Sequence, residues 1–106
     1  MSYEVAFYQP LEDPDDEEAG EHFFLASTGG WGAFIHWVTA LPEEDYPSLV
    51  RFCKEGMVKD TEALREQLKQ AFKAHRPDSQ FVRSVARQLF WAIRWGDPEE
   101  VAAVEV

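Results

Sequence analysis

The chain has 106 residues, which is enough for one domain with its own hydrophobic core. Its 45% hydrophobic content excludes a disordered chain, and its net charge of -10 at pH 7 disfavours nucleic acid and anionic membranes as partners. Cys53 is the only cysteine, and no apolar run approaches the roughly 20 residues that span a bilayer, so we expect one cytoplasmic domain over residues 1–106 without a disulfide or membrane association.

Residues 1–27 are predicted to form an antiparallel β-hairpin. β-forming side chains alternate from Tyr3 to Tyr8, and a second β-forming run covers residues 22–26. The segment between them, residues 10–20, is an acidic loop, and its acidic residues are Glu12, Asp13, Asp15, Asp16, Glu17 and Glu18. We interpret this loop as a solubilising tip or as a surface for a partner. It lacks the ligand spacing and the central glycine of a calcium-binding loop.

The chain changes character at the glycine-rich segment 27–32. Three glycines in four positions predict a tight joint between the strands and a helical part over residues 28–96. Thr28 or Ser27 is expected to cap the first helix, with the glycines just inside it. Apolar side chains then recur at three- and four-residue spacing, which predicts a first helix that is stopped by Pro42. Trp31 and Phe34 are expected to anchor this helix in the core. The segment has no basic residue and no P-loop spacing, so it does not predict a phosphate site.

Three further helices are predicted in the helical part. Pro47 suits the first turn of the second helix, and Gly56 suits the left-handed residue that ends it. The segment that begins at Asp60 is expected to open the third helix. After the turn at residues 76–79, Asp78 or Ser79 is expected to cap a fourth helix that reaches about Trp95. The inward-facing residues of the last two helices are predicted to be Leu64, Leu68, Ala71, Phe72, His75, Val82, Val85, Ala86, Leu89, Ala92 and Ile93.

The predicted fold class is α+β. The N-terminal antiparallel β-hairpin is expected to pack on three to four helices, because two strands alone are not stable. The last two helices are expected to form an antiparallel helical hairpin, since a short turn joins them. Residues 97–106 remain open between a tail and a short strand.

No combination of residues in the sequence indicates catalysis or a cofactor. His22, His36 and His75 lie far apart, and neither an H-E-x-x-H nor a C-x-x-C spacing occurs. Cys53 lies on an apolar helical stripe with no neighbouring base in the sequence to activate it. We therefore expect no enzyme activity, no cofactor and no metal site.

One face of the fourth helix is the candidate partner-binding surface. At 100° per residue, Arg83, Arg87 and Arg94 fall within about 40° of one another, and Trp91 lies opposite the core side. Arginine and tryptophan are over-represented at binding hot spots. The alternative is that these arginines pair with the acidic loop of the same chain.

Acidic and basic residues are distributed unevenly along the chain. Residues 1–50 contain eleven acids and neither lysine nor arginine, whereas residues 51–96 contain ten bases and five acids. Together with the absence of catalytic motifs, this predicts a small acidic cytosolic protein-binding or regulatory module, whose partner is another protein or a second copy in a homodimer. The alternative is a small-molecule-binding protein or enzyme that uses an aromatic pocket near Trp31 and Trp37.

Overall fold

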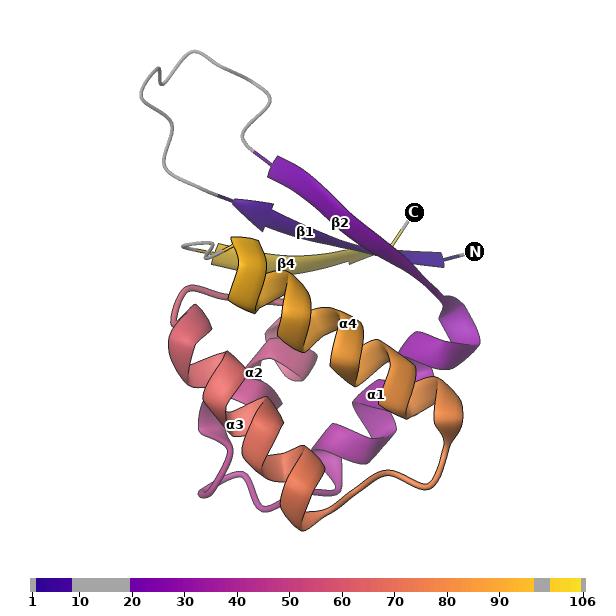
Figure 1. Ribbon diagram of the computed structural model, residues 1–106, viewed down its shortest axis with the longest axis vertical. Helices are drawn as coiled ribbons and strands as arrows, with labels where there is room; N and C mark the ends of the chain where they lie inside the picture. The colour runs from indigo at the N-terminus through magenta and orange to yellow at the C-terminus, as the bar shows by residue number, and fades with distance from the viewer. Residues whose placement is uncertain (1, 9–19, 97–99, 106) are drawn as a thin grey trace.

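The computed structural model describes residues 2–8, 20–96 and 100–105, with side chains described for residues 29–95 and 100–103. It confirms an α+β fold that contains four helices and antiparallel strands. The elements are β1 (Ser2–Tyr8), β2 (Gly20–Ser27), α1 (Thr28–Thr39), α2 (Pro47–Glu55), β3 (Met57–Val58), α3 (Thr61–Ala74), α4 (Gln80–Gly96) and β4 (Glu100–Glu105). The helices lie together on one side of the strands, with α1 and α4 against β2 and α2 beside β3 (Figure 1).

The strands pair in an antiparallel sheet of order β2-β1-β4-β3. β1 lies between β2 and β4, with Ser2 opposite Ser27 of β2 and Tyr3 opposite Glu105 of β4. Strands from the two ends of the sequence are therefore neighbours, and the N and C labels lie close together in Figure 1.

The C-terminal segment is a strand in the part that the structure describes. Val101 of β4 is fully buried and lies opposite Val58 of β3, which is also buried. Burial of these two side chains favours a paired strand over a free tail. This answers the question left open for residues 97–106 over the range 100–105. The short strand β3 lies within the segment 28–96, so this segment is not helical throughout. β3 was not predicted from the sequence.

The glycine-rich segment joins β2 to α1, as predicted, and its glycines lie inside the helix. Gly29, Gly30 and Gly32 all lie in α1, and none of them has a left-handed φ. A Cβ atom added at Gly29 or Gly32 would meet no atom within 4 Å outside the adjoining residues and helix backbone, so neither position requires glycine for space. Glycine lowers helix propensity, and we attribute this helix start to the burial of Trp31 and Phe34 one turn later.

The core joins all four helices to β3 and β4. In α1, the Trp31 ring lies 5.2 Å from the Phe34 ring and meets the Phe52 ring of α2 edge-on at 6.0 Å, which confirms the two α1 residues as anchors. The fully or almost fully buried side chains of the other elements include Leu49, Leu64, Leu68, Leu89, Ile93 and Val101. Truncating one such side chain to alanine typically costs about 2–5 kcal/mol.

Most helix ends follow the local chemistry of the sequence. Pro47 occupies the first turn of α2, and Gly56 ends it with φ 77°. Asp60 accepts a hydrogen bond from the Ala63 amide at the start of α3, and Ser79 accepts one from the amide of Phe81 at the start of α4. The predictions for Pro47, Gly56 and Asp60 are therefore confirmed.

The first turn of α2 is capped by a side chain of α3. Gln67 Oε1 accepts hydrogen bonds from the amides of Ser48 at 2.8 Å and Leu49 at 3.1 Å. Tyr46, which precedes α2, makes no side-chain capping bond. Free amides at a helix start need an acceptor, so α2 depends on α3 for this purpose.

Candidate binding groove between α3 and α4

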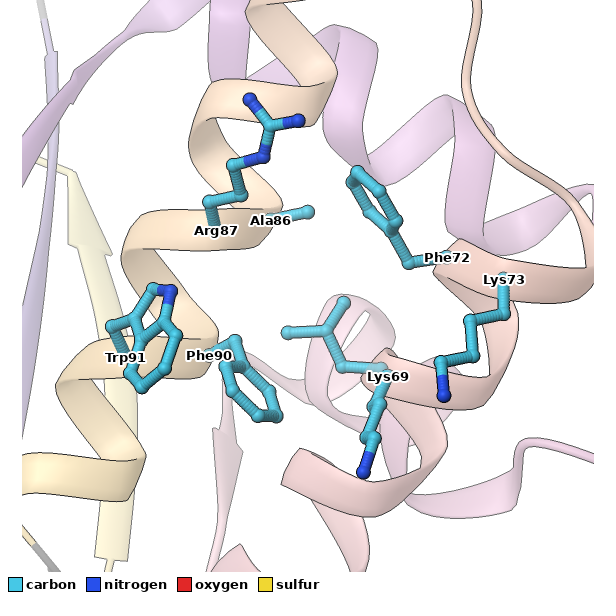
Figure 2. Close-up of a pocket in the computed structure, with 8 residues that line it drawn as sticks. Lys69, Phe72, Lys73, Ala86, Arg87, Phe90 and Trp91 are labelled. Carbon is cyan, nitrogen blue, oxygen red and sulfur yellow. The ribbon is translucent and has the colours of Figure 1, made fainter.

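α3 and α4 pack against each other and run in opposite directions in Figure 1. Between them lies an open groove with a volume of about 200 Å³. Its lining residues are Leu68, Lys69, Phe72 and Lys73 from α3, and Ala86, Arg87, Phe90 and Trp91 from α4. We call this set the α3–α4 groove. Figure 2 shows Phe72 and Phe90 projecting from opposite helices toward the hollow.

The groove follows from the spacing of apolar residues on the two helices. Leu68 and Phe72 are four residues apart on α3, as are Ala86 and Phe90 on α4, so each pair lies on one helix face. Leu68 and Ala86 are buried, whereas the two phenylalanines are half-buried. Because Ala86 has no side chain beyond Cβ, it leaves space between the phenylalanine walls.

Three cationic side chains surround this apolar floor. Lys69 and Lys73 lie one turn apart on α3, and Arg87 extends from α4. The Arg87 guanidinium carbon lies 5.6 Å from the centre of the Phe72 ring, within cation–π range. No acidic residue lines the groove. The groove is therefore cationic in a protein whose net charge is -10.

The groove cations form no ion pair within the described part of the chain. The salt bridges there join Lys54 to Glu43 and Arg65 to Glu66. The Glu66 carboxylate, which lies within one helical turn of Lys69, is 3.5 Å from Arg65. Lys69 therefore keeps its charge available at the groove.

Exposed tryptophans continue the surface beyond the groove. Trp91 is 51% exposed, and Trp95 is 79% exposed one turn later. Their rings stack at 6.0 Å, and the Trp91 ring also meets Phe90 edge-on at 5.2 Å. Large exposed aromatic side chains next to one another are characteristic of interaction surfaces.

The structure divides the arginine strip predicted on the fourth helix. Arg87 and Trp91 line the groove, as a partner-binding role requires. Arg83 is half-buried, and its Nη1 donates hydrogen bonds to the Pro77 and Asp78 carbonyls, so it fastens the turn between α3 and α4. Arg94 is exposed but does not line the groove.

The other half of the groove was missed by sequence reasoning. The sequence analysis did not assign Lys69 or Lys73 to a binding surface, and it predicted Phe72 only as an inward-facing residue. The useful signal was the predicted antiparallel helical hairpin, which places the C-terminal half of α3 beside α4. The six predicted acidic-loop residues, Glu12, Asp13, Asp15, Asp16, Glu17 and Glu18, lie outside the described residues.

The aromatic residues of α1 have structural roles. Trp31 and Phe34 are core residues, and the indole Nε1 of Trp37 donates a hydrogen bond to the His75 carbonyl at 2.9 Å. This bond joins α1 to the end of α3. His75 itself was predicted to face inward, but it is exposed because it lies at the C-terminal end of α3. Its ring meets the Tyr46 ring edge-on.

Cys53 is a free cysteine whose side chain is largely buried. Burial raises the pKa of the Cys53 thiol to about 12, so the thiol stays protonated at neutral pH. No three histidine, cysteine or carboxylate side chains in this part of the chain gather where they could hold a metal ion. Across the same residues, no helix combines the length and the apolar character needed to cross a membrane.

Comparison of the chain with protein-family models, curated proteins and solved structures finds no match. The function must therefore be argued from the groove itself.

Proposed function

We propose that this protein is a cytosolic protein-binding or regulatory module without catalytic activity, and that the α3–α4 groove is its binding surface. The observation that carries the proposal is the half-exposed Trp91 beside an apolar groove with cationic edges. A few aromatic and arginine side chains usually provide most of the binding energy at a protein interface. Trp91 and Arg87 are residues of these types.

The size of the groove favours a protein partner over a small molecule. Ligand pockets usually have volumes of about 300–1,000 Å³ and enclose most of the ligand. The α3–α4 groove has about 200 Å³ and is open to solvent, so it suits one bulky side chain of a partner. The alternative, a ligand pocket near Trp31 and Trp37, gains no support. Trp31 is buried in the core, and the Trp37 indole donates a hydrogen bond to the His75 carbonyl.

The proposal assigns a scaffold role to the remaining elements. The N-terminal hairpin over residues 1–27 would support α1 and α4 by packing on them. The helical hairpin of α3 and α4 would carry the groove. In this arrangement the partner is either another protein or a second copy of the chain.

Affinity capture with two matched variants tests the proposal. Trp91→Glu places a charge at the groove, whereas Phe81→Glu makes a comparable change at another exposed aromatic residue of α4 that does not line it. A partner retained by the wild type and Phe81→Glu but lost by Trp91→Glu supports the proposal. Equal retention by all three proteins would show that the groove is not the binding surface.

A further inference from the structure

The charges around the α3–α4 groove indicate the chemistry of its occupant. Lys69 and Lys73 are separated by four residues, or roughly 6 Å along the helix axis, and Arg87 lines the groove from α4. A guanidinium packed against an aromatic ring can still donate hydrogen bonds at its edges to a carboxylate. Within the described residues Arg87 donates no hydrogen bond, so these edges are free for a partner.

The floor of the groove adds a second requirement. Leu68 and Ala86 form an apolar base, and Phe72 and Phe90 form apolar walls. A purely charged segment would leave this surface in contact with water, whereas a bulky apolar side chain would cover it. The occupant therefore needs an apolar anchor and neighbouring carboxylates.

We infer that the groove binds an acidic segment of another protein, in which a bulky apolar side chain is flanked by carboxylates. This inference rests on the proposed function and defines its partner class. It follows from the three groove cations, the lack of any lining carboxylate and the apolar floor.

The net charge of the protein favours a short acidic segment over a long polyanion. At about 0.1 M salt the Debye length is about 10 Å, so a short segment in the groove interacts mainly with the charges close to it, which include the three groove cations. A nucleic acid would extend beyond them and be repelled by a molecule of net charge -10.

Selection from a random-peptide display library tests the inference without assuming a partner. Peptides that bind the wild type but not Trp91→Glu depend on the groove. We expect these peptides to contain glutamate or aspartate beside phenylalanine, tryptophan or leucine. A synthetic peptide of this type is then titrated against two charge-reversal variants.

The two variants are matched in charge and exposure. Lys69→Glu/Lys73→Glu reverses two groove cations, and Arg51→Glu/Lys59→Glu reverses two exposed cations that do not line the groove. We expect the first variant to weaken binding by about tenfold or more, and the second by less than about threefold. Raising the salt from about 0.1 M to about 1 M should also weaken wild-type binding, because the Debye length falls to about 3 Å.

The possible failures are distinguishable. Groove-dependent peptides that are neutral or basic, or equal weakening by both variants, would overturn the acidic partner class and leave the proposed function intact. Peptides that bind wild type and Trp91→Glu equally would overturn the proposed function as well. Dimerisation of the wild type that Trp91→Glu abolishes would identify a second copy as the occupant and overturn the inference of a different protein.

Discussion

Replacing Gln67 with alanine tests whether α3 stabilises α2 through the two hydrogen bonds to its first turn. Gln67 Oε1 accepts from the amides of Ser48 and Leu49, and both of these residues are buried. Water therefore has little access to the amides once the acceptor is removed. The change leaves two donors at the helix start without their partner.

The expected cost of Gln67→Ala follows from those two bonds. A typical hydrogen bond contributes about 0.5–1.5 kcal/mol, and loss of a helix N-cap costs about 0.5–2 kcal/mol. We expect the free energy of unfolding to fall by about 2 kcal/mol. With a urea dependence of about 2 kcal/mol per molar, the midpoint of urea unfolding should fall by about 1 M.

Two further variants separate capping from other effects. Gln70→Ala makes the same change at an exposed position of α3 and should leave the midpoint almost unchanged. Gln67→Glu keeps an oxygen acceptor and adds negative charge at a helix start, so it should retain most of the wild-type stability. If Gln67→Ala and Gln70→Ala unfold at the same urea concentration, the proposed capping of α2 is wrong.

Three further predictions concern the scaffold and its exposed face. In thermal unfolding, Gly32→Ala should stabilise the protein by about 0.5–1 kcal/mol, because Gly32 is helical with free space around it. Gly56→Ala should instead destabilise it by about 1 kcal/mol, because Gly56 has φ 77°. A change of the same sign for both variants would contradict this. In urea unfolding, Trp91→Ser should lower the free energy of unfolding by about 1 kcal/mol or less, because the Trp91 side chain is half-exposed. Phe34→Ala should lower it by about 3–5 kcal/mol, because Phe34 is fully buried. Comparable losses would show that Trp91 is a core residue. Because the pKa of Cys53 is raised in the folded protein, the thiol of the unfolded chain loses its proton first as the pH rises. The contribution of Cys53 to stability should therefore decline between pH 9.0 and about 12. If the free energy of unfolding of Cys53→Ala falls over this range as steeply as that of the wild type, Cys53 makes no such contribution.

The helix ends could be predicted because they depend on neighbouring residues. Pro47, Gly56 and Asp60 each act through their own backbone conformation or a hydrogen bond within one turn. β3 and β4 could not be predicted with the same certainty, because their pairing joins segments that are distant in the sequence. The capping of α2 by Gln67 is non-local for the same reason.

Local propensity was misleading where tertiary packing decides the structure. Gly29 and Gly30 have low helix propensity, but they lie in α1, whose next turn is buried in the core. The α3 side of the groove could not be predicted either, because packing between the helices decides which side of α3 meets α4. Arg83 could not be separated from Arg87 by helical angle alone, because its hydrogen bonds to turn carbonyls depend on the folded turn.

The most direct test of the α3–α4 groove as the binding surface is an NMR titration that follows the four tryptophan indole signals. On addition of an acidic peptide with an apolar anchor, the indole of Trp91 and the backbone amides of Lys69 and Phe90 should shift. The signals of the Trp31 and Trp37 indoles should not shift, because the Trp31 ring is buried in the core and the Trp37 indole is hydrogen-bonded to the His75 carbonyl. Shifts at these two indoles with none at Trp91 would contradict the groove and favour an aromatic pocket on α1.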